Sequence, residues 1–294
     1  MFKILRPIFH IINAVAILAL IAIHFIIKES TYQTSLYYYT FPLPAIIIIV
    51  LVLSIFLSKS FRKYNLFIAG IFLIIWLSRS FKIHFPDAID ETDVEVVFWN
   101  ATHYREFEDV FEEDGSIPDV VVLVEYHGDY LEEARTNYSK YHFYESSAEE
   151  MGIFSKEPIQ VIQVMPSKYG STVINFKTHD LNFYAVDVSA SIDVPRSWEL
   201  EFVDETITQT KNTVVLGDFN VPYESKFLDP IKENFNHAFT EKGNGFRETW
   251  FWNIPFLSLD HIWASKDLEI LRAKKIGTWK SDHAIVSTII RAKL

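Results

Sequence analysis

The sequence predicts an α/β domain with two packed sheets flanked by helices, preceded by three transmembrane helices. Three observations lead to this fold class. Residues 1–85 contain three apolar stretches in succession. Residues 86–294 contain many short apolar runs separated by helix-like and turn-like segments, which is typical of a sheet-rich globular domain. The charge divides at the same place, because residues 1–85 carry a net +7 whereas the whole chain carries −11.

The predicted membrane spans cover about residues 7–27, 41–58 and 64–80. The first span contains no Asp, Glu, Lys or Arg. At about 1.5 Å per residue it is long enough to cross an apolar layer of roughly 30 Å. Each stretch taken alone also fits a buried core helix, but three in succession favour spanning. His10, Asn13 and His24 are interpreted as helix-packing or interfacial residues, with a functional role as the alternative.

Basic residues predict the orientation of these spans. Lys3 and Arg6 precede the first span, and Lys59, Arg62 and Lys63 lie between the second and third. The segment between the first two spans is neutral and rich in tyrosine. Because positively charged loops stay in the cytoplasm, the N-terminus is predicted to be cytoplasmic. An odd number of spans then places residues 86–294 outside the cytoplasm, although Arg79 and Lys82 at the far end of the third span oppose this orientation.

Strands in the second domain are predicted from runs of β-branched and aromatic residues. The first two runs are "VEVVFWN" and "DVVVLVE", and residues 141–189 alternate and turn in the manner of four or five strands. Beyond these, the predicted strands cover 213–220, 247–252, 257–265, 268–279 and 283–292. Strands therefore outnumber helices, and about 200 residues suit one domain rather than two.

Helices are predicted between these strand groups. Residues 105–114 form an amphipathic pattern that Gly115 and Pro118 end, and residues 128–138 are also helical in pattern. Pro195 begins a helix over 195–209, because proline is well tolerated in a first helical turn. A broken helix is expected over 225–235.

Several predicted strands end in a polar residue of chemical use. Such a residue taken alone is most simply a turn former or a helix cap. A buried acid inside an apolar run needs a partner, however, and one rim of a sheet could gather the whole set. Gly217 is expected to turn the backbone at the edge of the sheet and so present the next residues. The set consists of Asn100, Glu125, Asp218, Asn220, Asp260, Asp282 and His283.

This set of side chains suits hydrolysis of a phosphoester. The chain has no cysteine, so its metal ligands are oxygen and imidazole, and carboxylates suit a hard cation such as Mg²⁺. An aspartate paired with a histidine fixes the imidazole tautomer and raises its basicity. Together these groups suit in-line attack of water on a phosphomonoester or phosphodiester.

The motifs "WN", "LVE", "GDFN", "LDHI" and "SDH", in this order over residues 94–290, resemble the endonuclease/exonuclease/phosphatase superfamily. That superfamily includes pancreatic-type deoxyribonucleases, abasic-site endonucleases, neutral sphingomyelinases and inositol-phosphate phosphatases. The resemblance implies a four-layer α/β sandwich, and it covers none of the membrane region. Membrane-anchored bacterial members with a few N-terminal spans look similar overall.

The resemblance also implies a role for each motif residue. Glu125 would be the main ligand of Mg²⁺, with Mn²⁺ as an alternative metal, while Asn100 would lie beside it and Asp282 could assist. Asp218 would position or deprotonate the attacking water.

The remaining motif residues would act on the phosphate. Asn220 would hold the phosphate or the attacking water, and His283, oriented by Asp260, would contact the scissile phosphate as base or electrostatic stabiliser. Whether an aspartate or the histidine takes the proton stays open at this point.

One position departs from the family pattern. Many members have a histidine in the strand before the long helix, where this chain has Asp187. An aspartate there would repel a phosphate unless it were protonated or bound a second cation. His103 and His127 are candidates to substitute, with ordinary loop histidines as the alternative. The competing hypothesis is therefore a catalytically weak relative that binds a ligand or partner at the cell surface.

The charge of the second domain bears on the substrate. Residues 86–294 carry a net −18, which argues against duplex DNA because nonspecific nucleic-acid binding relies on Lys and Arg. A lipid headgroup, a small phosphodiester or an extracellular nucleic acid fits better. The aromatic residues at 250–252 and 256 could touch membrane lipid or belong to the core.

Overall fold

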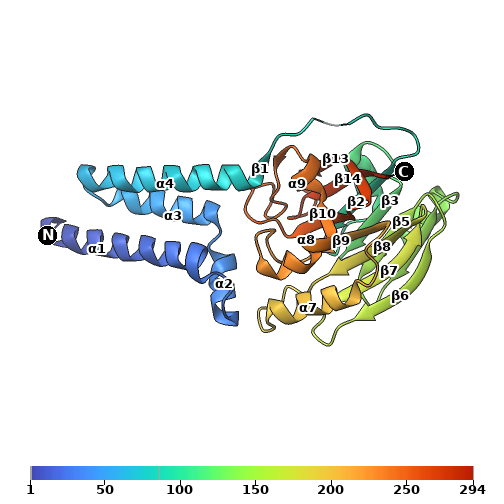
Figure 1. The fold of residues 1–294 in the computed structure, drawn as a ribbon, viewed down its shortest axis with the longest axis horizontal. Coiled ribbons are helices and arrows are strands. Elements are labelled where there is room, and N and C mark those ends of the chain that lie inside the picture. Colours follow the sequence, from blue (N-terminus) through green and yellow to red (C-terminus); the bar gives the residue numbers. More distant parts are fainter. Residues whose placement is uncertain (1, 86, 294) are drawn as a thin grey trace. The chain divides into compact units, whose positions relative to one another are not determined.

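The computed structural model describes residues 2–85 and 87–293 of the chain. The chain divides into two compact units, one ending at Phe81 and the other beginning at Lys82. The first unit is helical, and the second contains two large sheets with helices (Figure 1). Position 86, in the predicted linker, lies outside the described residues.

The helices of the first unit provide two or three candidate membrane spans. They are α1 (Phe2–Ile21), the π-helix η1 (Ala22–Ile27), α2 (Tyr32–Thr40), α3 (Leu43–Ile55) and α4 (Lys59–Ser80). Two segments, Pro7–Ile27 and Lys59–Ser80, are long and apolar enough to cross a membrane. A third span exists only if α2 and α3, bent by 65°, count as one. By itself α3 has 13 residues, and it reaches only about 20 Å at 1.5 Å per residue.

Helix α2 corrects the expectation of a loop between the first two apolar stretches. Thr31 caps this helix, and its side chain accepts a hydrogen bond from the backbone N–H of Thr34. The Thr34 hydroxyl in turn accepts one from the backbone N–H of Thr31 at 2.9 Å. This reciprocal cap satisfies two backbone donors that a helix start otherwise leaves without partners, so the chain turns helical before the apolar run begins.

An amide pair connects helices within the first unit. The side-chain amides of Asn13 in α1 and Asn65 in α4 exchange hydrogen bonds at 3.0 and 2.7 Å. Asn65 also donates to the carbonyl of Val50 in α3. His24 is buried and stacks on Tyr38. These contacts give Asn13 and His24 packing roles, as amide pairing between apolar helices stabilises their association.

The first sheet of the second unit has the strand order β13-β14-β2-β3-β5-β4. Only β2 and β3 in this sheet run parallel, and the other neighbours are antiparallel. Its strands are β2 (Val94–Asn100), β3 (Val120–Val124), β4 (His142–Ser146), β5 (Met151–Ser155), β13 (Leu268–Ile276) and β14 (Ile285–Ala292). The parallel pair places the polar residues that follow β2 and β3 at one edge.

The second sheet repeats this pattern with the order β10-β12-β9-β8-β7-β6. Here β8 and β9 form the parallel pair. The strands are β6 (Gln160–Pro166), β7 (Thr172–Thr178), β8 (Leu181–Asp187), β9 (Thr213–Asp218), β10 (Phe235–His237) and β12 (Asp260–Ser265). Residues 141–189 thus supply five strands, in agreement with the predicted four or five.

Helices flank both sheets (Figure 1). Side chains of α5 (Phe107–Asp114) and α6 (Leu131–Asn137) pack on the outer face of the first sheet against Trp99 and Leu123. The remaining elements are α7 (Arg196–Thr206), the 3-10 helix η2 (Lys226–Leu228), α8 (Asp229–Asn234), α9 (Ala238–Lys242), and the short strands β1 (Phe81–Lys82) and β11 (Gly245–Phe246). Helices α5, α6 and α7 and the broken helix formed by η2 and α8 match the predicted helices closely. The short helix α9 and the short strands β1, β10 and β11 were not predicted.

The two sheets bury one apolar layer between them, and strand alternation decides which residues enter it. Val96 and Phe98 of β2 face this layer, together with Val214 and Leu216 of β9. Because side chains alternate between faces along a strand, Asn100 and Asp218 continue the inward-facing series. The polar residues therefore lie where the apolar layer between the sheets ends.

Gly217 has a different role from the predicted turn. Strand β9 continues through it to Asp218, with Gly217 in register with Val186 of β8. A Cβ at this position would lie 1.9 Å from the carbonyl oxygen of Val186. The position requires glycine because a neighbouring backbone approaches it closely, rather than because the chain turns there.

The predicted strand over 247–252 is not present as a strand. Among these residues Trp250 makes isolated bridges to Leu257 and His283. The apolar run "TWFW" favours a strand by composition, but the segment folds back on residues 254–257 through backbone hydrogen bonds. Tertiary packing overrides strand propensity here.

Candidate active site

Three aspartates lie side by side on neighbouring strands of the second sheet. Asp218 at the end of β9 is in register with Asp187 of β8 and with Asp260 of β12. The alternation described above points all three towards the layer between the sheets. Asp218 and Asp260 are buried, with 1% and 2% of their surface exposed. Like charges directly opposite one another are destabilising, so this row requires positive partners or bound protons.

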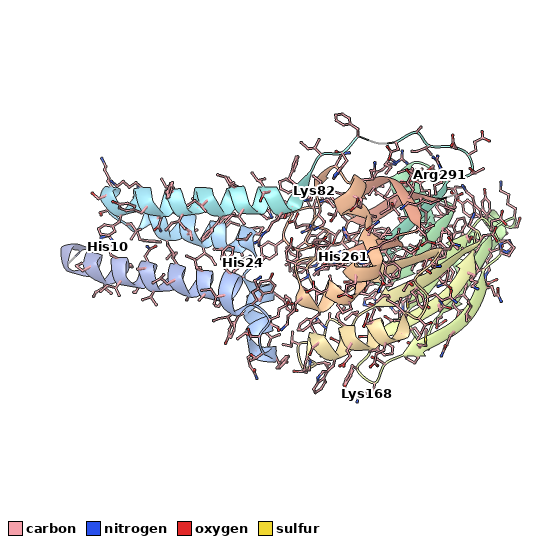
Figure 2. The ribbon with its side chains drawn as sticks, in the orientation of Figure 1. His10, His24, Lys82, Lys168, His261 and Arg291 are labelled. Atoms are coloured by element: carbon pink, nitrogen blue, oxygen red, sulfur yellow. The ribbon has the colours of Figure 1, made fainter. Side chains whose placement is uncertain are left out.

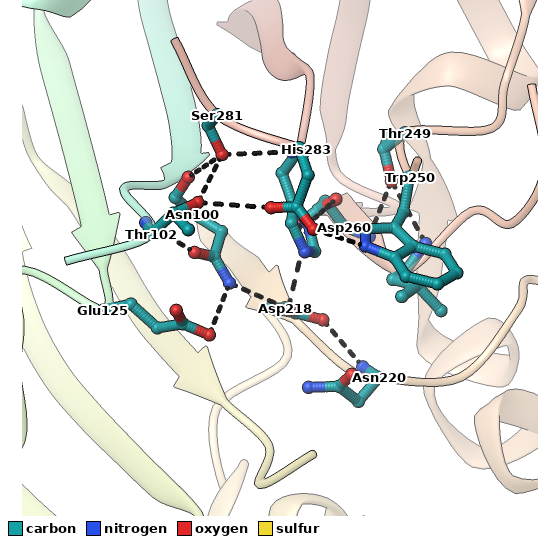
Figure 3. Close-up of polar contacts among 12 residues, drawn as sticks. Asn100, Thr102, Glu125, Asp218, Asn220, Thr249, Trp250, Asp260, Ser281 and His283 are labelled. Atoms are coloured by element: carbon teal, nitrogen blue, oxygen red, sulfur yellow. Dashed lines mark hydrogen bonds and ion pairs between the residues drawn. The ribbon is translucent and has the colours of Figure 1, made fainter. Parts of the chain in front are cut away.

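The facing sheet contributes an amide and a further carboxylate. The side-chain nitrogen of Asn100 donates to Glu125 Oε1 at 3.1 Å and to Asp218 Oδ2 at 3.2 Å (Figure 3). The side-chain oxygen of Asn100 accepts from the backbone N–H of Thr102 at 3.0 Å. Asn100 therefore connects the two sheets and holds the two carboxylates near each other.

His283 supplies the positive partner for the aspartates. Its Nδ1 lies 2.9 Å from Asp260 Oδ2 and 4.0 Å from Asp218 Oδ2. Trp99 Nε1 donates to the carbonyl oxygen of His283, and Ser281 Oγ accepts from its backbone N–H, both at 3.0 Å. These contacts fix the backbone and the ring, so the imidazole is held with Nδ1 towards Asp260.

The environment separates the pKa values of these groups. Burial lowers the pKa of His283, but the charge and hydrogen bond of Asp260 and the charge of Asp218 outweigh it and raise the pKa to about 10. Burial, together with the charge of Asp260, raises the pKa of Asp218 to about 7. At neutral pH the histidine is therefore protonated, while the aspartate exchanges a proton readily.

Asp187 lies within the same electrostatic field. Burial raises its pKa well above the ordinary value, and the charges of Asp218, Glu125 and Glu150 raise it further. This residue occupies the position where a family histidine was expected, and its environment shifts the carboxyl group towards its protonated form.

The other predicted site residues lie at the edge of this cluster. Asp282 Oδ2 accepts from Trp250 Nε1 at 2.9 Å, and its Oδ1 lies 3.3 Å from the hydroxyl of Thr102. The backbone N–H of Asn220 donates to Asp218 Oδ1 at 2.8 Å, and its side chain donates to the carbonyl oxygen of Val188. In these contacts Asn220 orients Asp218, whereas Asp282 contacts Trp250 and Thr102 rather than Glu125.

Four residues of this network were not expected from the sequence. The hydroxyls of Thr102 and Ser281 lie 2.5 Å apart, and Ser281 also donates to the carbonyl oxygen of Asn100. Thr249 Oγ1 accepts from the backbone N–H of Asp260, and Trp250 contacts Asp282. Ser281 belongs to the motif "SDH" and Thr102 lies two residues after the motif "WN", so the sequence could have indicated both. Thr249 and Trp250 gave none, because their contacts come from a segment with no regular structure.

The oxygen donors of this cluster fit a hard divalent cation. Glu125 Oε1 and Asp218 Oδ2 both lie within 3.2 Å of one nitrogen of Asn100. The Glu125 side chain is 34% exposed, so an ion can reach it from solvent. Carboxylate oxygens that face one another in this way suit Mg²⁺ or Mn²⁺, which take oxygen ligands. The side-chain nitrogen of Asn100 donates a hydrogen bond to each of these carboxylates and so holds them in position.

Comparison with protein families decides the affiliation of the chain. Residues 97–283 match the model of the Endonuclease/Exonuclease/phosphatase family. The chain belongs to this family. The matched residues contain all seven candidates of the sequence analysis, together with Asp187. A search of curated proteins finds no match for the chain.

Solved structures share the family fold at low sequence identity. An endonuclease/exonuclease/phosphatase family protein from Bacteroides thetaiotaomicron superposes with a TM-score of 0.55 at 14% identity, covering 70% of this chain and 100% of that one. The mannosyl-6-phosphatase Bt3783 of the same organism gives 0.52 at 14% identity, covering 67% and 99%. D. rerio TDP2, solved with a single-strand DNA product, gives 0.50 at 14% identity, covering 69% and 100%.

Membership of the endonuclease/exonuclease/phosphatase family accounts for the two packed mixed sheets flanked by helices. The family match begins inside β2 and ends at His283 just before β14, so it spans both parallel strand pairs. Glu125 and Asn220 have φ angles of 50°. Such backbone conformations are costly for residues other than glycine, and they commonly occur at functional sites.

Proposed function

We propose that this chain is a membrane-anchored, divalent-metal-dependent phosphoester hydrolase. One observation carries the proposal: Asn100 joins Glu125 and Asp218 within 3.2 Å, beside a histidine that Asp260 holds. This arrangement combines oxygen donors for a cation, a carboxylate with a pKa of about 7 and a buried cationic imidazole. Those are the groups that hydrolysis of a phosphoester by water requires.

The proposed mechanism assigns the proton transfer to Asp218. Its pKa of about 7 allows it to accept a proton from water near neutral pH, and the backbone N–H of Asn220 keeps it in position. His283 is protonated at that pH, so it stabilises the negative charge of the phosphoryl group rather than acting as base. Of the two alternatives that the sequence left open for the base, we therefore propose the aspartate.

Glu125 would be the main protein ligand of Mg²⁺ or Mn²⁺, and Asp218 would remain available to accept the proton. Such a cation neutralises charge on the phosphoryl oxygens. Asn100 keeps the two carboxylates near each other and so prearranges the donor set. Asp282, by its contacts to Trp250 and Thr102, supports the segment that carries His283.

An apolar loop beside the site favours a lipid headgroup as the substrate. Trp252, 37% exposed, donates its backbone N–H to the carbonyl oxygen of Asp282, and Ile254 in the same loop is 56% exposed. Side chains of this kind bind at a membrane interface. The net −18 of residues 86–294 argues against duplex DNA for the same site.

We expect the full-length chain in detergent micelles to hydrolyse a phosphodiester when Mg²⁺ or Mn²⁺ is present. The panel should contain phospholipids, bis-p-nitrophenyl phosphate, sugar phosphates and single-stranded oligonucleotides. Excess EDTA is expected to abolish turnover, and added Mg²⁺ to restore it, because the carboxylates are then left without a cation to offset their charge. Hydrolysis that persists in EDTA would contradict metal dependence, and a preference for oligonucleotides over phospholipids would contradict the lipid assignment.

Asp187 supports a second candidate function, a weakly catalytic relative that binds a phosphoester ligand. Its carboxyl group stands where the family pattern has a histidine, and burial favours its neutral form. Tight binding of a ligand from the same panel, without turnover under any of the metals tested, would favour this second function.

The membrane topology depends on whether α2 and α3 count as one span. With three spans, the basic residues place the N-terminus in the cytoplasm and the catalytic unit outside it. We propose this orientation, and we expect an alkaline phosphatase reporter fused after Leu294 to be active and a cytoplasm-specific reporter to be inactive. The reverse pattern would show that α2 and α3 form a re-entrant pair and that the catalytic unit is cytoplasmic.

A further inference from the structure

A second group of metal-binding side chains lies next to Glu125. His103, His127 and Glu150 each offer one ligand atom, and these atoms all lie within 4.8 Å of one another. The three residues follow or precede strands of the first sheet: His103 comes after β2, His127 after β3, and Glu150 directly before β5. The mechanism proposed above does not use any of them.

Backbone hydrogen bonds hold the three segments together. The backbone N–H of His103 donates to the carbonyl oxygen of Glu125, and that of Tyr126 donates to the carbonyl oxygen of Glu150, both at 2.8 Å. The imidazole rings of His103 and His127 lie 5.1 Å apart between centroids. The side chains are thus brought together by a connected framework rather than by chance proximity of mobile loops.

The distance between His103 and Glu150 matches an edge of a metal coordination shell better than it matches a hydrogen-bonded ion pair. The Nδ1 atom of His103 lies 3.4 Å from Glu150 Oε2. A charge-assisted hydrogen bond would be about 2.7–2.9 Å long. In a tetrahedral site with metal–ligand distances of about 2.0–2.1 Å, neighbouring ligand atoms are roughly 3.4 Å apart.

One ring nitrogen of His103 has no hydrogen-bond partner among the described residues. This atom, Nδ1, is also shielded from solvent. Buried polar atoms normally have a partner. Histidines that bind a metal commonly direct their second nitrogen to a carboxylate, and here Nε2 points towards Glu125.

We infer that His103, His127 and Glu150 bind a transition-metal ion of the Zn²⁺ type, with Glu125 linking this ion to the site of the hard cation. Two imidazoles and one carboxylate suit Zn²⁺ rather than Mg²⁺, because Mg²⁺ prefers oxygen ligands. Three protein ligands leave a coordination position open for water or a ligand oxygen.

A second cation would also relieve the excess of negative charge at the site. Glu125, Glu150, Asp187 and Asp218 interact electrostatically, and His283 is the cationic side chain that acts on Asp187. A negatively charged phosphoester has to approach these carboxylates, which would repel it. On the proposed function, the second ion would offset Asp187, the residue that replaces the family histidine, whereas the binding of the ion itself depends only on the three ligands.

The test measures Zn²⁺ bound to the full-length chain in detergent by mass spectrometry after equilibration against buffered free Zn²⁺. We expect one Zn²⁺ per chain in the wild type, and an affinity about 100-fold lower in His127→Ala because one of three ligands is lost. Glu150→Gln is expected to weaken binding in the same direction. Circular dichroism and the melting temperature would show that each variant is folded.

His142→Ala is the matched control, because His142 lies on the same hairpin at its far end. It is in register with Ser155, four residues along β5 from Met151, which follows Glu150. That separation is about 13 Å at 3.3 Å per residue. We expect unchanged Zn²⁺ binding in this variant.

Two results would overturn the inference: wild-type protein that binds no Zn²⁺, or folded His127→Ala and Glu150→Gln proteins that bind it as tightly as the wild type. Either result leaves the proposed hydrolase function standing, because the readout is bound metal rather than turnover. Conversely, Zn²⁺ binding that follows this pattern in a protein without Mg²⁺-dependent hydrolysis would support the inference and reject the proposed function.

Discussion

Replacing His283 by alanine is expected to lower kcat by about 10³-fold, the magnitude typical of removing a charge-stabilising group from an active site. The side chain of His283 is 9% exposed and is held by Asp260, whose side chain is fully buried. Removing it takes away the positive charge nearest to Asp218 and leaves Asp260 without its partner. The measurement is steady-state hydrolysis of the best phosphodiester of the panel by full-length protein in detergent.

The pH profile distinguishes this role from a structural one. Activity requires Asp218 without its proton and His283 with its proton. Turnover by the wild type should therefore rise with pH up to about 7 and fall near pH 10. In His283→Ala the fall near pH 10 should disappear from the residual activity.

Controls address the fold of the His283 variant. Because an unpaired buried carboxylate is costly, the double variant His283→Ala with Asp260→Asn is needed to separate lost stability from lost chemistry. His142→Ala should retain wild-type turnover. A folded His283→Ala protein with turnover within about tenfold of the wild type would remove His283 from the mechanism.

Replacing Glu125 by alanine is expected to lower metal-dependent turnover by about 10³-fold or more. The reason is that the carboxylate of Glu125 is the solvent-exposed donor of the oxygen cluster. Glu125→Gln keeps the shape of the side chain and one oxygen but removes the charge. It should therefore raise the Mg²⁺ concentration needed for half-maximal activity, and by less than the alanine variant does. A titration of activity against Mg²⁺ measures both effects.

Glu241→Gln provides the matched control for Glu125, because Glu241 is an exposed glutamate on α9. It should show the wild-type Mg²⁺ dependence. If Glu125→Ala kept full activity at the wild-type Mg²⁺ requirement, the assignment of the metal donor would be wrong. Loss of activity without any change in Mg²⁺ dependence for Glu125→Gln would indicate a role in positioning instead.

Much of the fold was accessible from local sequence patterns. The apolar runs at 94–100, 120–124 and 213–218 became strands because each is long enough and β-branched enough to be buried on both faces. Predictions were wrong where tertiary contacts dominate. "RETWFW" has the composition of a strand but folds back on itself, and the tyrosine-rich loop became helix α2 through a cap formed by two threonines.

The catalytic candidates were recognisable from the sequence because side chains alternate between the two faces of a strand. Asp218 and Asn100 have the same inward parity as the apolar residues two and four positions earlier. His261 has the opposite parity to Asp260. It is buried on the other face of β12, inside the second unit (Figure 2), where burial lowers its pKa to about 4 and it pairs with His237. A motif containing both "D" and "H" therefore contributes only its aspartate to the site.

By itself the sequence determined the apolar helices, the order and burial of most strands, and the identity of the polar residues that end them, because these depend on composition and periodicity over a few neighbouring residues. Only the tertiary structure decided which strands pair, and hence that Asp187, Asp218 and Asp260 form one row and that Asn100 joins two sheets. The same is true of the cluster formed by His103, His127 and Glu150. Pairing between distant strands depends on contacts that no local pattern encodes, so neither the row of aspartates nor the second metal site can be read from one stretch of chain.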